Sequence, residues 1–271
     1  MKRILAVFAF SALAVSAQDW ARQQLEKSPR HHEWTTVKHN GRSVEAFVAY
    51  PESKNKTPVV LIIHEIFGLT DWIQDVADQV AAAGYIAIAP DLLSGMGPNG
   101  GRTTSFAQNQ ATEAVGHLNP DQVTADLNAT ADYALKLPAS NGTLFVAGFC
   151  WGGSQTFRFA TNRRDLAGAF VFYGSAPMKP GKPGTLDKDA LARIKAPVYG
   201  FYGGNDARID ATISPTSDAM KQLGKTYDPV TYEGAGHGFM RAGEAPDAKD
   251  ANKKARADAW QRWKTLLRQS S

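Results

Sequence analysis

A single cysteine, Cys150, lies in a segment typical of a sharp turn that presents a reactive side chain. Residues 148–153 read Gly-Phe-Cys-Trp-Gly-Gly; an apolar run at 143–147 precedes them, and residues 154–160 can form a helix. A strand, a Gly-x-Cys-x-Gly turn and a helix form the context of a nucleophile elbow, whose strained tip lifts one side chain clear of the backbone. The flanking glycines lack a Cβ, which lets strand and helix approach closely. The alternative interpretation of Cys150 is a small buried hydrophobic residue.

A thiol with the ordinary pKa of ~8.5 is largely protonated at neutral pH, so a nucleophilic cysteine needs a base within hydrogen-bonding reach. Residues 202–206 (Tyr-Gly-Gly-Asn-Asp) place Asp206 after an apolar run, and residues 234–239 (Gly-Ala-Gly-His-Gly-Phe) place His237 after the next. His237 can take the thiol proton and later return a proton to the leaving group, while Asp206 holds the imidazole in the required tautomer. Cys150 also precedes a predicted helix, whose unpaired N–H groups favour a thiolate.

Both partners of the cysteine also have structural interpretations. Asp206 could be only a turn residue, and Asp210 is close enough in sequence to compete for its role. His237 could be a loop histidine between two glycines. The order nucleophile, acid, histidine is, however, the order of the α/β-hydrolase architecture, and this order favours the catalytic interpretation.

A fourth motif, residues 64–68 (His-Glu-Ile-Phe-Gly), places Glu65 at the end of another apolar run. The backbone N–H of Trp151, together with one from Ile66 or Phe67, could form an oxyanion hole, in which each donor stabilises a transition state by roughly 3 kcal/mol. Glu65 has an alternative role as a negative charge at the start of the following helix.

Alternating strands and helices must position these four motifs. The sequence predicts first a helix at 19–27 and then a hairpin of residues 34–39 and 44–50. Further strands are predicted at 58–64, 85–89, 143–147, 167–172, 196–202 and 230–232. Further helices are predicted at 71–83, 121–135, 154–160, 214–223 and 247–267. Residues 93–104, rich in Gly, Ser, Pro and Asn, are predicted to be irregular. The pattern indicates one α/β domain with a mostly parallel sheet flanked by helices and a site at the carboxyl ends of the strands.

The composition is that of a soluble globular protein: 271 residues, 43% hydrophobic and 21% charged, with a net charge of +4. This length accommodates one large α/β domain. The chain has no basic stripe interleaved with aromatic residues, so we expect no nucleic-acid partner. His, Cys and Asp residues show no metal-ligand spacing, so we expect neither a metal nor another cofactor. One cysteine allows no intrachain disulfide, and we expect a monomer.

The N-terminus resembles a signal sequence. Lys2 and Arg3 precede an apolar run at 4–15, which is short for a membrane span, and small residues follow at 15–17. We therefore expect residues 1–17 to be removed, leaving a domain of residues 18–271 that is periplasmic or secreted and is not attached to a membrane.

Together, four motifs resemble those of dienelactone hydrolases, in the same order: residues 65–68, 148–153, 203–206 and 236–239. The resemblance extends from about residue 44 to the C-terminus. It implies an α/β-hydrolase fold and a triad of Cys150, His237 and Asp206. It also implies hydrolysis of a lactone or small carboxylic ester, as by a carboxymethylenebutenolidase, through an acyl-enzyme on Cys150. A further implication is that Glu65 contacts the resting thiol and accepts its proton when substrate arrives.

The substrate is less closely defined by the resemblance. Family members that hydrolyse carboxylated dienelactones hold the carboxylate with two arginines. Arg241 matches one of them; Ser and Gly occupy positions 94–95, where the other is expected, and Arg102 is a possible substitute. A more general ester or lactone specificity is the alternative. Phe67 and Tyr173, together with the Trp of the elbow, could line the site or belong to the core.

Two other functions would use the same residues. A general carboxylesterase would share the fold and the acyl-enzyme. A thiol-dependent redox protein or peroxidase would use Cys150 as a sulfenic acid, but the chain has no second cysteine to resolve that species.

Overall fold

The computed structural model describes residues 19–270, so the predicted signal sequence at 1–17 lies outside the described residues. The strands are β1 His32–His39, β2 Arg42–Ala49, β3 Thr57–Ile63, β4 Ile86–Pro90, β5 Ser140–Phe149, β6 Leu166–Phe172, β7 Val198–Gly203 and β8 Tyr227–Tyr232. They form one sheet in the order β1-β2-β4-β3-β5-β6-β7-β8. Strand β2 is antiparallel to both neighbours, and β4, β3 and β5 to β8 are parallel. This is the mostly parallel sheet that the sequence predicts.

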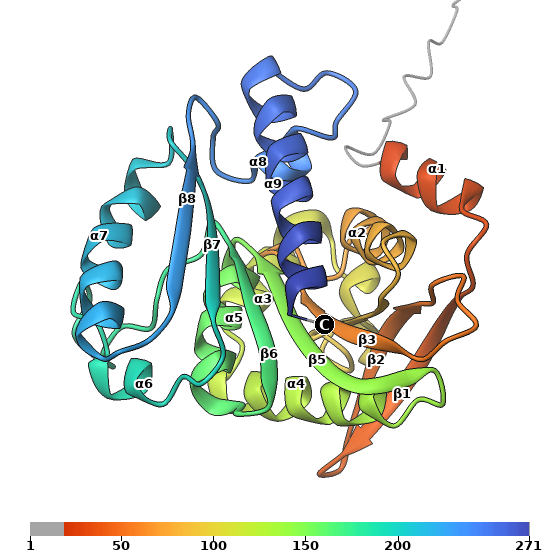
Figure 1. Cartoon of the computed structure of the whole chain (residues 1–271). Helices are drawn as coiled ribbons and strands as arrows, with labels where there is room; N and C mark the ends of the chain where they lie inside the picture. Colours follow the sequence, from red (N-terminus) through yellow and green to blue (C-terminus); the bar gives the residue numbers. More distant parts are fainter. Residues whose placement is uncertain (1–18, 271) are drawn as a thin grey trace, which may run out of the picture.

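Helices cover both faces of the sheet (Figure 1). They are α1 Asp19–Lys27, α2 Asp71–Ala82, α3 Gln108–Gly116, α4 Pro120–Leu135, α5 Trp151–Asn162, α6 Lys188–Ala192, α7 Ala207–Gln222, α8 Phe239–Ala242 and α9 Asp250–Gln269. Helices α1, α2 and α9 contribute to the core on one face, and α4 to α7 contribute to the core on the other. Within residues 19–270, no helix combines the length and the apolar character that a membrane crossing requires.

The centre of the sheet explains the apolar runs of the sequence. All seven residues of β3 are buried, because β4 and β5 flank this strand and helices cover both of its faces. The antiparallel hairpin at the edge turns at Asn40 and Gly41, which have positive φ angles of 45° and 75°. Such a turn needs φ > 0 at both positions, and Asn-Gly meets that need with little strain.

Four helices differ from the sequence-based expectation, and one of them is the unpredicted four-residue helix α8. Helix α3 is not predicted from the sequence, because its pattern shows little periodicity: among its residues whose burial is described, Ala111 and Val115 are the buried apolar ones. Helix α6 has five residues and lies in a segment rich in Pro and Gly. Helix α7 begins at Ala207 rather than at 214, because Pro215 lies inside the helix although proline is more typical of a first turn.

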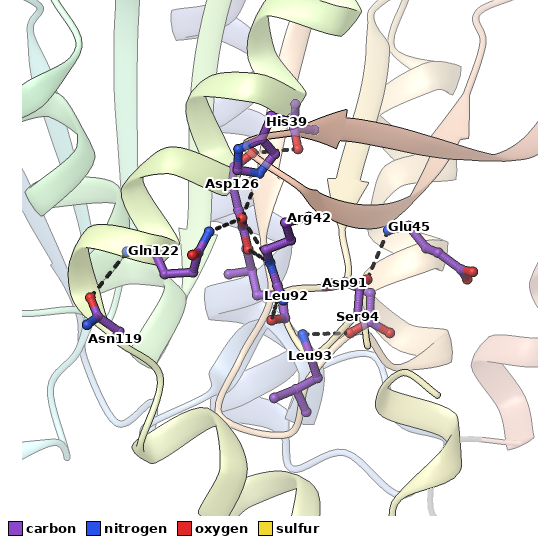
Figure 2. Close-up of polar contacts among 11 residues, drawn as sticks. His39, Arg42, Glu45, Asp91, Leu92, Leu93, Ser94, Asn119, Gln122 and Asp126 are labelled. Atoms are coloured by element: carbon purple, nitrogen blue, oxygen red, sulfur yellow. Dashed lines mark hydrogen bonds and ion pairs between the residues drawn. The ribbon is translucent and has the colours of Figure 1, made fainter. Parts of the chain in front are cut away.

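A buried carboxylate holds the segment after β4 against the rest of the fold. Asp126 on α4 accepts hydrogen bonds from His39 and Arg42 at the end of the β1–β2 hairpin (Figure 2). Arg42 Nη2 also donates to the carbonyl of Leu92 at 3.0 Å, and the Ser94 hydroxyl accepts from a backbone N–H of β2 at 2.9 Å. The hairpin, α4 and the segment after β4 therefore form one connected polar cluster.

Candidate active site

Cys150 lies at the turn between β5 and α5. Its backbone has φ 56° and ψ −116°, a strained conformation for a residue with a side chain. A Cβ at Gly148 would overlap the backbone of Gly152, and one at Gly152 would overlap the carbonyls at the end of β3. Both glycines are thus required by close backbone approach. The structure places the cysteine at a turn with the geometry of a nucleophile elbow.

The ring of His237 lies between the sulfur of Cys150 and the carboxylate of Asp206 and contacts both. His237 Nε2 lies 3.1 Å from Cys150 Sγ, and Nδ1 is hydrogen-bonded to Asp206 Oδ2. Asp206 lies three residues after the end of β7 and immediately before α7, and His237 lies in the loop that leads from β8 to α8. Because β5, β7 and β8 are parallel, their carboxyl ends lie at one edge of the sheet, where the three loops meet.

The charge state of His237 follows from these two contacts. The hydrogen bond with Cys150 and, after the opposing effect of burial, the hydrogen bond with Asp206 raise the pKa of His237 to about 9. An imidazolium next to sulfur favours the thiolate, which is the nucleophilic form of cysteine. The arrangement therefore places a charged imidazole, supported by a carboxylate, next to the sulfur.

Asp210, the alternative acid, lies one turn along α7. Its backbone N–H donates to the Asp206 carbonyl at 2.9 Å, and its buried Oδ1 has no hydrogen-bond partner among the described residues. Burial and then the charge of Asp206 raise the pKa of Asp210. The carboxylate that contacts His237 is therefore that of Asp206.

Glu65 pairs with an arginine in this structure. Its Oε2 accepts a hydrogen bond from Arg241 Nε at 2.8 Å, while the hydrogen-bond partner of Cys150 Sγ is His237. The expected contact between Glu65 and the resting thiol is thus replaced by an ion pair. Burial raises the pKa of Glu65, and the guanidinium of Arg241 opposes that effect. The physical reason for the pairing is that a buried carboxylate needs a compensating charge.

The predicted substrate-binding residues occupy two different environments. Phe67 is 39% exposed, and its ring centre lies 5.2 Å from the guanidinium carbon of Arg241, whose side chain is 32% exposed. Tyr173 is only 1% exposed, and its ring packs edge-on against His237 at 5.1 Å between ring centres. Phe67 and Arg241 therefore form an accessible wall, whereas Tyr173 supports the histidine from the core.

Arg102, the candidate second arginine, has other partners. Its guanidinium carbon lies 3.5 Å from the ring centre of Trp34 on β1, and its Nε lies 3.4 Å from Glu45 on β2. These contacts place it at the antiparallel edge of the sheet. Among the described residues, the arginine that contacts the Glu65 carboxylate is Arg241 alone. The structure therefore does not bring the two arginines together.

The loop that follows β3 is held by the segment after β4. Gly68 N–H donates to the Glu65 carbonyl at 3.2 Å, and Leu69 N–H donates to the Thr103 hydroxyl at 3.1 Å. Thr103 donates in turn to Asp91 Oδ1 at 2.7 Å, and a Cβ at Gly68 would overlap the Thr103 side chain. Thr103 and Asp91 are not predictable as site-supporting residues from the sequence, because their Gly- and Ser-rich surroundings carry no periodic signal.

His64, which lies between Glu65 and the end of β3, is a further residue of the site without a predicted role. Its ring stacks on the partly buried Trp151, with 5.5 Å between ring centres and 15° between planes. A histidine at the end of a wholly apolar strand was the signal that could have identified it. Over residues 19–270, no three His, Cys, Asp or Glu side chains gather as a metal site would require.

Known proteins match most of the chain. The sequence profile of the Dienelactone hydrolase family matches residues 44–271. A protein of Methylorubrum extorquens named "Putative carboxymethylenebutenolidase" is 34% identical over 233 residues, which cover 83% of this chain and 77% of the relative. A protein of Escherichia coli K12 with the same name is 30% identical over 242 residues, which cover 84% of this chain and 83% of the relative.

The fold of this chain also resembles solved structures of dienelactone hydrolases. The crystal structure of a "Putative Dienelactone Hydrolase" from Klebsiella pneumoniae superposes with a TM-score of 0.76 at 27% identity, covering 89% of this chain and 99% of that one. The sheet order and the loops that meet at its carboxyl edge are those of an α/β-hydrolase. The chain belongs to the dienelactone hydrolase family, and it is an enzyme of the hydrolase class.

Proposed function

We propose that this protein hydrolyses a lactone or small carboxylic ester, as a carboxymethylenebutenolidase does, through an acyl-enzyme on Cys150. The observation that carries the proposal is the 3.1 Å contact between Cys150 Sγ and His237 Nε2, with Asp206 on the other ring nitrogen. The names of the relatives support the class of substrate.

The reaction has two halves. In the first, the Cys150 sulfur bonds to the carbonyl carbon, and backbone N–H groups of Trp151 and Ile66 stabilise the oxyanion. The ester C–O bond then breaks, and His237 gives its proton to the leaving oxygen, which in a lactone stays attached to the acyl chain. In the second, His237 takes a proton from water, the hydroxide attacks the thioester, and the S–C bond breaks to release the acid.

The substrate carboxylate, where one is present, would meet a single arginine. Arg241 offers a partly exposed guanidinium beside Phe67, but Glu65 already balances its charge. Arg102 forms an ion pair with Glu45, and its guanidinium stacks on the ring of Trp34. We therefore propose that neutral lactones and esters are accepted as well as carboxylated ones.

The test is turnover of p-nitrophenyl acetate and of small enol-lactones by wild type, Cys150→Ala and His237→Ala. We expect wild-type hydrolysis to be lost in both variants, and mass spectrometry to detect an acyl adduct on Cys150 in the wild type. His31→Ala, which removes an exposed histidine, is the matched control and should retain full activity. Peroxide consumption without ester turnover would favour a redox function instead.

We also propose that residues 1–17 direct export. Expression of the full chain and of a chain starting at residue 18, followed by cell fractionation, tests this. Activity of both forms in the cytoplasmic fraction alone would contradict it.

A further inference from the structure

His64 is fully buried directly after β3, and its ring has one hydrogen-bond partner within residues 19–270. Its Nδ1 lies 2.7 Å from the carbonyl oxygen of Glu65. A carbonyl only accepts, so Nδ1 carries the proton and donates. Burial lowers the pKa of His64, which favours the neutral ring. Nε2 is buried and has no hydrogen-bond partner among the described residues.

The accepting carbonyl belongs to the peptide whose N–H is the predicted oxyanion donor. The carbonyl of Glu65 and the N–H of Ile66 are parts of one planar peptide unit. In a trans peptide, these two groups point in opposite directions, so a hydrogen bond that fixes the carbonyl also fixes the direction of the N–H. Gly68 N–H donates to the same oxygen at 3.2 Å, which strengthens the constraint.

The ring of His64 also contacts the second half of the predicted oxyanion hole. It stacks on Trp151, the residue after Cys150, whose N–H is the other predicted donor. One buried imidazole thus touches both segments that supply donors. An apolar side chain of similar size would fill this space without leaving a buried nitrogen unpaired, so packing alone does not account for a histidine.

We propose that His64 is a positioning residue that orients the Glu65–Ile66 peptide and thereby aims the Ile66 N–H at the oxyanion. The inference deepens the proposed function and rests on it for the identity of the oxyanion. A hydrogen-bonded carbonyl also polarises its peptide, which makes the N–H of Ile66 a stronger donor.

Two substitutions separate this role from packing. His64→Phe keeps the aromatic ring and its volume but removes the Nδ1 donor, whereas His64→Asn keeps an N–H near the position of Nδ1 and removes the ring. For ester hydrolysis, we expect kcat to fall about 10²-fold in His64→Phe, the effect of losing one oxyanion donor. KM should change little. The kcat of His64→Asn should be at least tenfold higher than that of His64→Phe.

The matched control is His117→Phe, because His117 makes the same type of contact, from Nδ1 to the carbonyl of Glu113 at 2.8 Å, on an exposed helix end. Its kcat should equal that of the wild type. A trifluoromethyl ketone, which forms an oxyanion when the thiol adds to it, should lose affinity in His64→Phe in proportion to kcat/KM. A loss of activity in both His64 variants that follows their fall in Tm would overturn the proposal.

A second readout needs no turnover. In ¹H–¹⁵N NMR spectra of the free protein, the Ile66 amide signal should shift in His64→Phe and return toward its wild-type position in His64→Asn. An unchanged Ile66 signal in His64→Phe would overturn the proposed orientation even if activity fell. A wild type that hydrolyses none of the test esters or lactones would instead overturn the proposed function, while the Ile66 signal would still decide whether His64 orients the peptide.

Discussion

The sulfur of Cys150 lies 3.1 Å from Nε2 of His237, although 87 residues separate them in the chain. The other ring nitrogen is hydrogen-bonded to Asp206, in the loop between β7 and α7. The contact depends on three loops at one edge of the sheet, so substitutions in any of these loops should affect the same chemistry.

Asp206→Asn should lower kcat for ester hydrolysis by about 10³- to 10⁴-fold, because an amide can hold the imidazole in the wrong tautomer and does not stabilise its charged form. Steady-state kinetics of wild type and variant measure this. Asp210→Asn is the matched control, one helical turn away, and should retain activity within a few-fold. Equal losses in the two variants would contradict the role of Asp206.

The thiol should be reactive in the free protein. The pKa of His237, raised to about 9, keeps the imidazole charged at neutral pH, and this charge lies next to the sulfur. Alkylation by iodoacetamide should therefore remain fast from pH 6 to pH 8, and should slow by about tenfold at pH 6 in His237→Gln.

His31→Gln is the control for the alkylation experiment, because that side chain is exposed and distant in sequence from the site. Slow alkylation of the wild type at pH 6, with no effect of His237→Gln, would indicate a neutral resting thiol. That result would favour the scheme in which Glu65 takes the proton only when substrate arrives.

The two arginines should differ in their effect on carboxylated substrates. Arg241→Lys removes the planar guanidinium but keeps a charge near Glu65, and it should raise KM for carboxylated lactones more than for neutral esters. Arg102→Ala should leave both KM values unchanged, because Arg102 pairs with Glu45 away from this contact. An increase in KM for carboxylated lactones in Arg102→Ala would show that Arg102 reaches the substrate.

Thr103→Val should destabilise the loop after β3. The change removes the hydroxyl that donates to Asp91 and accepts from Leu69 N–H, and an unsatisfied buried group costs about 1–3 kcal/mol of unfolding free energy. We also expect kcat/KM to fall about tenfold, because this loop carries a predicted oxyanion donor. Thr103→Ser should restore both quantities, and Thr104→Val at an exposed position should change neither.

A buried acid on α2 should make stability depend on pH. Burial and then the charge of Glu244 raise the pKa of Asp75 from 3.8 to about 7, and Gln79 Nε2 lies within 2.7 Å of an oxygen of each carboxylate. The charge of Asp78 also raises the pKa of Asp75, and the charge of Arg256 lowers it. Between about pH 4 and pH 7, the native state holds a proton that the unfolded state has lost, so stability falls as pH rises.

Asp75→Asn should remove this contribution. The variant should therefore gain stability relative to wild type as pH rises from 4 to 7, with the full difference present above pH 7. Urea unfolding across this range measures the effect, and Asp218→Asn, on an exposed position of α7, is the control. Parallel curves for wild type and Asp75→Asn would contradict the raised pKa.

The sequence by itself determined the features that depend on neighbouring residues. The apolar run that became β3, the Asn-Gly turn of the hairpin and the glycines around Cys150 were all predictable, because each depends on local conformation or on periodic burial. The chain order of the motifs also indicated the fold class, which the sheet and the structural relatives confirm.

Only the tertiary structure decided which side chains meet. It selected Asp206 over Asp210 as the partner of His237, paired Glu65 with Arg241, and placed Arg102 against Trp34. Such contacts join segments that are distant in the chain, and they depend on how the strands are ordered and how the loops pack. No local pattern carries that information, because the same residue types could form other pairs in another packing.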